Sequence, residues 1–337
     1  MDSDQSVLAE TFGASTLSAC ELCPRHCKAD RLSGDYGICG ADSFVEIGRA
    51  ALHFWEEPPL SGESGSGTIF FTHCPLHCVY CQNASLASGL VGRRISINRL
   101  AEICLELQDQ AALNINCVTP THYTPQIILA IKKARDQGLE LPVIWNTSGY
   151  EALPTIQVLK NTVDVYLTDF KYTSPDLAQA YSQAPDYPTV AAQALAAMVN
   201  QVGEPRFDRY QNQERMARGV IVRHLILPGA LEDSKRVVAY LAAEYGSAIR
   251  VSLMNQYTPL LEDLRSQGDK RATEILERFP VLAHTVSNED YERLLDYADT
   301  LGLEDYYWQE GGAVSESFIP DFDLTGVLKA QSHPVSQ

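Results

Sequence analysis

The chain has 337 residues, of which 45% are hydrophobic and 20% charged, a composition typical of a globular protein with a substantial core. A formal net charge of −17 repels phosphate backbones and anionic lipid, so neither nucleic acid nor a membrane is an expected partner. The first ten residues carry acids instead of a basic signal region, and no apolar run is long enough to cross a bilayer. We therefore expect a cytoplasmic protein whose nine cysteines indicate metal or redox chemistry.

Seven of the nine cysteines lie between residues 20 and 81, in two separate groups. The first group, here called the N-terminal quartet, consists of Cys20, Cys23, Cys27 and Cys39. Four thiolates complete a tetrahedral metal site, so residues 1–66 are predicted to form a small metal-bound lead-in. The spacing leaves two alternatives for that metal, a structural zinc ion or an auxiliary [4Fe–4S] cluster. Because Gly, Pro and Cys interrupt residues 13–62, little regular structure is expected there.

Residues 67–312 show a regular alternation of short β-branched or aromatic runs with stretches of helical period. The runs predict parallel strands at 68–73, 115–119, 142–148, 163–171, 219–228 and 250–257. Six βα units, short of the eight in a closed barrel, predict an α/β fold with a partial (β/α)6 barrel. Helices are expected over 100–111 and 125–138, and after the capping box Ser287–Asp290. Residues 313–337 are polar and are expected to form a C-terminal extension that ends in a loose tail.

Polar residues gather at the carboxyl ends of these predicted strands, the edge at which such folds carry their chemistry. Alternation places Asn146 and Ser148 on one strand face, and Asp169 and Lys171 on another, so each pair can enter one cavity. Further polar residues follow the second, fifth and sixth runs: Thr121, His122, His224, Asn255 and Gln256. Strand ends are often polar because they meet solvent, but the set as a whole favours a site.

The second cysteine group, here called the three-cysteine loop, consists of Cys74, Cys78 and Cys81 and directly follows the first predicted strand. A [4Fe–4S] cluster normally takes four Cys thiolates, so three in one loop leave one iron open to a non-protein ligand. The alternative is a zinc site completed by His73 or His77. The two other cysteines, Cys104 and Cys117, fall on an apolar helix stripe and inside a strand, and are expected to be core residues.

The C-x3-C-x2-C loop, with Tyr80 before its third cysteine, resembles the radical S-adenosylmethionine (SAM) superfamily. Within it, GSGTIFFTHCPLHCVYCQN is most similar to a subgroup homologous to pyruvate formate-lyase activating enzyme, and the similarity extends over roughly residues 18–310. The resemblance implies an open iron that binds SAM, reductive cleavage to a 5′-deoxyadenosyl radical, and hydrogen abstraction from a substrate. It further implies a one-electron donor such as flavodoxin or ferredoxin, and for an activase a protein substrate.

Carried over residue by residue, the resemblance assigns the cluster to the three-cysteine loop and places Tyr80 near the adenine of SAM. Asn146 and Ser148 match the strand that approaches the ribose or carboxylate. Asp169 and Lys171 match the Asp-x-Lys of the activases, and Asn255 with Gln256 ends the strand near the adenine. The family's Gly-Gly-Glu-Pro stretch, which binds the SAM amino group, is replaced by Thr119-Pro120-Thr121-His122. That contact is therefore expected from backbone carbonyls, Thr121 or His122.

Two other functions stay open at this point. One is a peptide- or protein-modifying radical SAM enzyme that is not an activase. The other is an iron–sulfur electron-transfer or binding protein that no longer turns over SAM, which the missing glutamate favours.

Overall fold

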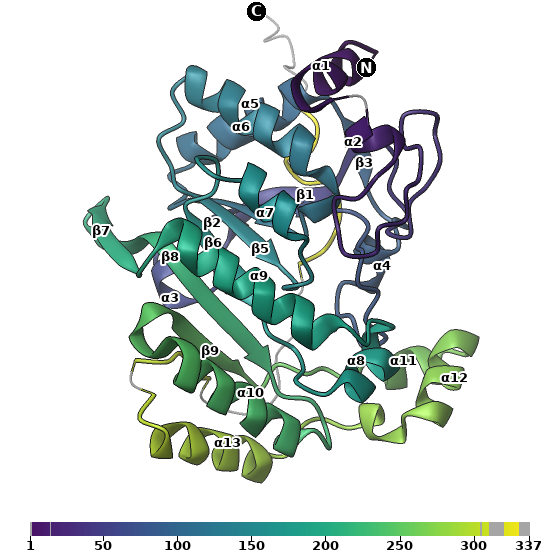
Figure 1. Cartoon of the computed structure of the whole chain (residues 1–337), viewed down its shortest axis with the longest axis vertical. Helices are drawn as coiled ribbons and strands as arrows, with labels where there is room; N and C mark the ends of the chain where they lie inside the picture. Colours follow the sequence, from purple (N-terminus) through teal and green to yellow (C-terminus); the bar gives the residue numbers. More distant parts are fainter. Residues whose placement is uncertain (1, 14, 304, 310–319, 330–337) are drawn as a thin grey trace, which may run out of the picture.

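The computed structural model describes residues 2–13, 15–303, 305–309 and 320–329, and its framework is one mostly parallel, nine-stranded sheet (Figure 1). Six strands are parallel and follow one another in chain order: β2 (Ser66–Phe71), β4 (Ile115–Val118), β5 (Val143–Thr147), β6 (Val165–Asp169), β8 (Gln213–Leu225) and β9 (Arg250–Met254). All six predicted strands are confirmed. Among the described residues no pairing joins β9 to β2, so the sheet is not a closed barrel.

Three antiparallel strands were not predicted: β1 (Val45–His53), β3 (Arg93–Ile95) and β7 (Arg206–Tyr210). β1 pairs with β2 and carries β3 on its other side, while β7 forms a hairpin with the first half of β8. The expectation of little regular structure over residues 13–62 is wrong at β1. The strand accommodates Gly48 because a Cβ there would lie 2.5 Å from Cδ1 of Leu86, so close packing against the strand explains this glycine.

The helices follow the strands and cover the sheet: α1 (Asp2–Phe12), α2 (Ser15–Ser18), α3 (Pro58–Ser61), α4 (Ala84–Ala87), α5 (Ile97–Asp109), α6 (Thr124–Asp136), α7 (Leu153–Val158), α8 (Pro175–Ser182), α9 (Tyr187–Val202), α10 (Leu231–Tyr245), α11 (Leu260–Ser266), α12 (Lys270–Arg278) and α13 (Asn288–Thr300). In Figure 1, α7, α9 and α10 lie in front of the strands. The three predicted helices correspond to α5, α6 and α13, and Ser287 caps α13 by accepting from Asp290 N–H. Searched over the described residues, no helix has the length and apolar character needed to cross a membrane.

The two faces of the sheet pack against different cores, and this separation positions the site. One face packs against the helices through the large core. The other face forms a second, smaller apolar cluster of Leu60, Ile144, Val165, Leu167, Met216 and Ile221. Side chains alternate along a strand, so the next residue on that second face is Asn146 after Ile144, Asp169 after Leu167, and Arg223 after Ile221. The apolar cluster therefore lies directly below the polar side chains of Asn146, Asp169 and Arg223 on the same face of the sheet.

Part of the predicted C-terminal extension packs on the sheet edge. Residues 320–329 follow β1, where Ala50 N–H donates to Thr325 O at 2.8 Å and Leu324 N–H donates to Gly48 O at 3.0 Å. The side chain of Val327 is fully buried. Residues 313–319 and 330–337 of the predicted extension lie outside the described residues.

Candidate metal and cofactor site

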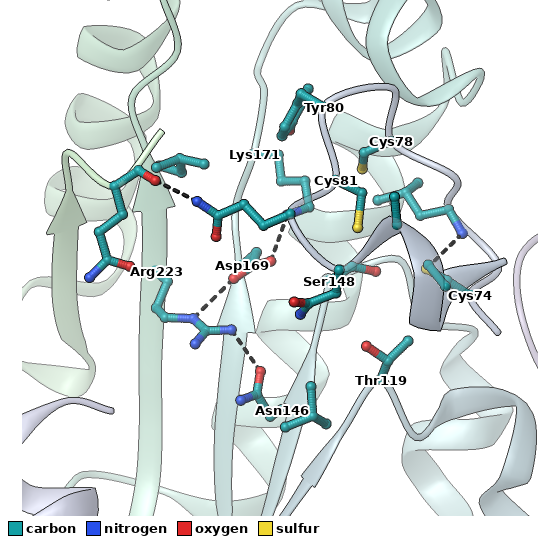
Figure 2. A pocket seen from close by; sticks show the side chains of 18 of the residues that line it. Cys74, Cys78, Tyr80, Cys81, Thr119, Asn146, Ser148, Asp169, Lys171 and Arg223 are labelled. Carbon is teal, nitrogen blue, oxygen red and sulfur yellow. Dashed lines mark hydrogen bonds and ion pairs between the residues drawn. The ribbon is translucent and has the colours of Figure 1, made fainter. Parts of the chain in front are cut away.

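A cavity of about 280 Å³ opens at the carboxyl ends of the parallel strands. Figure 2 shows the three-cysteine loop on one side of it and a layer of polar side chains on the other. The polar and aromatic residues that line it include Glu56, Cys74, Cys78, Tyr80, Cys81, Thr119, Asn146, Ser148, Asp169, Lys171, Arg223 and Gln256. The cavity thus joins the cysteines to five of the strand-end positions that the sequence singled out.

The three-cysteine loop leaves β2 and folds so that backbone N–H groups point at its sulfurs. Leu76 N–H donates to Cys74 Sγ at 3.4 Å. Ser182, at the end of α8 and fully buried, places its hydroxyl 3.2 Å from Cys78 Sγ. Hydrogen bonds to the sulfurs are a means by which proteins tune iron–sulfur clusters, so this donor set fits thiolate ligands of a cluster.

Two thiols of the loop, those of Cys74 and Cys81, are protonated at neutral pH unless a metal takes the place of the proton. Burial raises the pKa of Cys74 to about 11 and that of Cys81 to about 12, and the neighbouring cysteines add to the rise. Burial alone would lower the pKa of Lys171, but Asp169 and the Cys78 sulfur outweigh it and raise that pKa. Lys171 is therefore a lasting positive charge beside the sulfurs, as an anionic thiolate cluster requires.

Arg223 on β8 is the centre of a buried ion network opposite the cysteines (Figure 2). Its Nε lies 3.1 Å from Asp169 Oδ1, its Nη1 lies 3.3 Å from Glu56 Oε2, and its Nη2 donates to Asn146 Oδ1 at 2.6 Å. The same Asp169 accepts from Lys171 Nζ at 2.6 Å. Burial would raise the pKa of Asp169, yet Lys171 and Arg223 hold it below its usual value. Two cations and two carboxylates thus share one wall of the cavity.

Tyr80 belongs to a chain of hydroxyl groups that leads back to the cysteines. Its Oη lies 2.5 Å from that of Tyr172, which lies 3.0 Å from Ser182 Oγ, the partner of Cys78. Burial raises the pKa of both tyrosines well above the ordinary value, so they stay protonated hydrogen-bond donors. The ring of Tyr80 borders the cavity.

The structure brings six of the nine predicted cofactor contacts to the cavity wall: Tyr80, Asn146, Ser148, Asp169, Lys171 and Gln256. Thr121, His122 and Asn255 do not line it. Thr121 donates to Glu151 Oε1 at 2.5 Å, and the ring of His122 bonds to Thr72 O at 2.7 Å, both in buried surroundings. The short 3-10 turn Thr121–Tyr123 directs these side chains into the core.

Two residues of the site, Thr119 and Arg223, were not assigned to it from the sequence, and Glu56 was interpreted mainly as a solvated acid of a turn, with a gating role beside the cavity as the alternative. Arg223 was hidden because it directly precedes His224, whereas alternation from Ile221 would have pointed to it. His224 instead faces the core, where its Nδ1 lies 2.8 Å from Phe170 O. Thr119 has a left-handed φ of 58°, a strained conformation that is enriched at functional sites, and it borders the cavity.

The zinc alternative for the three-cysteine loop gains no support from the histidines. His77 Nε2 lies 2.8 Å from Ile38 O, and His73 Nε2 lies 3.8 Å from Glu46 Oε2. Within the described ranges, no three or more His, Cys, Asp or Glu side chains are grouped so that they could hold one metal ion. Cys104 and Cys117 are buried core residues, as predicted.

Comparisons with known proteins point to iron–sulfur chemistry in the same region. Residues 60–180 match the family described as a 4Fe-4S single cluster domain, a range that contains the three-cysteine loop but not the N-terminal quartet. A protein of Methanocaldococcus jannaschii, named uncharacterized protein MJ0674, is 25% identical over 299 residues, 86% of this chain and 76% of that protein. The monooxygenase RslO1 from Streptomyces bottropensis matches with a TM-score of 0.25 and 10% identity, over 74% of this chain and 93% of that chain. The structural similarity is too low to carry an argument, whereas the family match supports an iron–sulfur cofactor at the three-cysteine loop.

Proposed function

We propose that this chain is a radical SAM enzyme of the activating-enzyme type, built on a partial (β/α)6 barrel. The observation that carries the proposal is the placement of the three-cysteine loop at the mouth of a cavity whose opposite wall is polar and charged. Three thiolates with hydrogen-bonded sulfurs suit a [4Fe–4S] cluster with one open iron. With SAM bound, such a cluster supplies one-electron reductive cleavage of the sulfonium and a radical for hydrogen abstraction.

The residues of this chain would bind and orient SAM. Lys171 and Arg223 supply positive charge for its carboxylate, and Asp169 fixes the Lys171 ammonium in place. Asn146, Ser148 and the strained Thr119 present hydrogen-bonding groups for the amino acid and ribose portions. Tyr80 and Gln256 border the part of the cavity suited to an adenine, and Gln82 holds the strand end by donating to Gln256 O at 2.5 Å. Glu56, which lines the cavity, would offer a carboxylate to the amino group, the role that the family gives to the glutamate missing here.

The substrate we propose is a peptide segment of a partner protein, and the electron comes from a flavodoxin- or ferredoxin-type donor. A peptide- or protein-modifying radical SAM enzyme that is not an activase has the same cavity chemistry. The rival without SAM turnover is favoured by one observation, that Thr121 and His122 do not reach the cavity.

The test is anaerobic incubation of the iron-reconstituted, full-length chain with dithionite and SAM, followed by chromatography for 5′-deoxyadenosine and methionine. We expect both products from the wild type and neither from Cys78→Ala. Cys104→Ala, which removes a core cysteine, serves as the matched control and should retain product formation. Iron-loaded wild-type protein that gives no 5′-deoxyadenosine, and whose electron paramagnetic resonance (EPR) signal ignores SAM, would leave the electron-transfer function in its place.

A further inference from the structure

The N-terminal quartet is brought together by a tight loop that precedes β1. Cys20, Cys23 and Cys39 are buried, and Cys27 is half-buried. Gly37 lies against two of the sulfurs, because a Cβ on it would be 3.3 Å from Sγ of both Cys27 and Cys39. The loop turns through left-handed conformations at non-glycine residues, with φ of 42° at His26 and 53° at Lys28. Such conformations are enriched at ligand-binding and functional sites, so the backbone of the loop is compatible with a metal site.

Arg31 gives an independent sign that this site holds negative charge. Its side chain is fully buried, and it donates to the backbone oxygens of Asp42 and His122, the latter at 2.7 Å, and to Cys20 Sγ at 3.7 Å. In the described part of the chain Arg31 forms no salt bridge, since the Asp42 carboxylate pairs with Arg94 instead. A buried charge without a counter-charge is costly. Four cysteine thiolates around a [4Fe–4S]²⁺ core carry a net charge of about −2, which supplies the missing partner.

The arrangement of the quartet favours a cluster over zinc. With Zn–S bonds of about 2.3 Å, one tetrahedral zinc ion would hold its four sulfurs roughly 3.8 Å from one another. No set of three or more potential ligands within the described residues converges in a way that suits one ion, and this includes the quartet. A cluster, whose thiolates bind four different irons, accommodates sulfurs that are spread more widely.

The quartet is bonded directly to the three-cysteine loop at two points. Arg25, between Cys23 and Cys27, donates from Nε to Pro75 O at 2.9 Å and from Nη2 to Leu76 O at 3.2 Å. In the other direction, His77 Nε2 lies 2.8 Å from Ile38 O, next to Cys39. Each contact makes a continuous path of covalent bonds and one hydrogen bond between a quartet cysteine and a cysteine of the three-cysteine loop.

We propose that the N-terminal quartet binds a second [4Fe–4S] cluster, that Arg31 is its buried counter-ion, and that this cluster passes electrons to the three-cysteine loop. A flavodoxin- or ferredoxin-type donor gives up one electron, which reduces the quartet cluster from 2+ to 1+. The same electron then moves on, so that the quartet cluster returns to 2+ as the cluster of the three-cysteine loop becomes 1+. The second cluster is independent of SAM cleavage, whereas the electron path rests on the cluster part of the proposed function.

The first experiment counts metals in anaerobically reconstituted, full-length protein. We expect about eight irons per chain in the wild type and about four after Cys74→Ser, Cys78→Ser and Cys81→Ser are combined. That triple variant should still give an EPR signal on reduction with dithionite. Zinc in place of iron in the triple variant, or about four irons in the wild type with no loss on Cys20→Ser plus Cys23→Ser, would overturn the second cluster. The number of irons bound by the wild type tests for a second cluster even if a variant fails to fold.

The second experiment tests the counter-ion. Arg31→Met should lose iron from the quartet while keeping about four irons in the three-cysteine loop, and Arg31→Lys, which keeps the charge, should retain more of the quartet iron. Arg94→Met, which removes a half-exposed arginine of the same region, is the matched control and should keep about eight irons. Full iron retention in Arg31→Met would refute the role of Arg31.

The third experiment tests the electron path. The triple variant and the Cys20→Ser, Cys23→Ser variant each give a reference EPR spectrum of one cluster. Freeze-quenched mixing with a reduced flavodoxin should then show the quartet signal before that of the three-cysteine loop. Arg25→Met should slow the appearance of the second signal about tenfold at unchanged iron content. Simultaneous reduction of both clusters, or an unchanged rate in Arg25→Met, would contradict the path.

Discussion

At the scale of single residues, the cavity depends on charges that are buried but paired. The Arg223 side chain keeps 18% of its surface exposed and contacts two carboxylates, Asp169 and Glu56, whose side chains are 17% and 8% exposed. Burial raises the pKa of Glu56 even with Arg223 beside it, which shows how strongly this wall penalises an unpaired carboxylate. The function of the wall therefore rests on complete pairing.

Replacing Arg223 with methionine should lower the free energy of unfolding by about 3–5 kcal/mol, because two buried carboxylates lose their cation. The measurement is urea unfolding of wild type and variant under identical metal loading. Arg265→Met is the control, since Arg265 and Glu262 form an exposed pair on α11 whose loss should cost below about 1 kcal/mol. Equal effects of the two substitutions would show that the network contributes no special stability.

Ser182 offers a test of how the protein tunes the cluster. Its hydroxyl lies 3.2 Å from Cys78 Sγ, and a hydrogen bond to a ligating sulfur stabilises the more negative, reduced state. Ser182→Ala should therefore lower the reduction potential of that cluster, by about 40 mV if the bond contributes about 1 kcal/mol. An EPR-monitored redox titration measures it, and Ser88→Ala, on an exposed helix end, should leave the potential unchanged.

Glu151 should make stability fall as the pH rises. Burial raises its pKa from 4.5 to about 7, although hydrogen bonds from Thr121 and Thr147 oppose the shift. Between pH 4.5 and 7 the folded state therefore keeps a proton on Glu151 that the unfolded state loses. The stability that Glu151 contributes is fully present below pH 4.5, falls as the pH rises to about 7, and is constant above that pH. In urea unfolding, the free energy of unfolding of Glu151→Gln, taken relative to that of the wild type, should rise by roughly 2–3 kcal/mol from pH 5 to pH 8. A constant difference across this range would contradict the raised pKa.

At the scale of elements, local sequence signals were reliable where the signal and the packing agree. The six parallel strands were predicted from short apolar runs, and α5, α6 and α13 from helical periodicity and end signals. β7 was missed because an antiparallel edge strand is defined by the strand beside it, and β1 was missed because glycine interrupts its apolar pattern. Charged, exposed residues are acceptable at such an edge, as those of β7 illustrate.

The N-terminal cap of α13 can be tested alone. Ser287 Oγ accepts from Asp290 N–H at 3.1 Å and satisfies a donor that the helix leaves free. Ser287→Ala should lower the free energy of unfolding by about 1 kcal/mol, while Ser287→Asn, another good capping residue, should cost little. Thermal unfolding followed by circular dichroism measures both. If Asn is as harmful as Ala, the side-chain bond is not the source of the stability.

At the scale of the whole molecule, metal binding and folding are expected to be coupled. The N-terminal quartet and the three-cysteine loop come from separate segments that meet only in the folded chain, where Arg25 and His77 bridge them. Burial raises the pKa of Cys23 and that of Cys81 to about 12, so the metal-free protein keeps these two thiols protonated.

Removing iron with a chelator under anaerobic conditions should therefore lower the midpoint of thermal unfolding by several degrees, because the binding energy of a metal centre is part of the folding energy. The effect should be smaller in the variant that combines Cys74→Ser, Cys78→Ser and Cys81→Ser, which has fewer ligands to lose. Cys117→Ala, a core substitution, should shift the midpoint of thermal unfolding by the same amount in the iron-loaded and the iron-free protein. An unchanged midpoint on iron removal would separate metal binding from folding.

The cysteine spacing, the order of the six parallel strands and the polar residues at their ends could be predicted from the amino-acid sequence, because these features depend on local periodicity and ligand type. The sequence also placed Asn146, Asp169 and Lys171, since a strand end in a parallel sheet has only one edge to occupy. Long-range packing, by contrast, turns Arg223 and Glu56 toward the cavity and Thr121 and His122 into the core. The same packing buries Arg31 beside the quartet and forms the bridges between the two cysteine groups. Such pairings join positions far apart in the chain, and no local pattern encodes which distant charge or carbonyl will complete them.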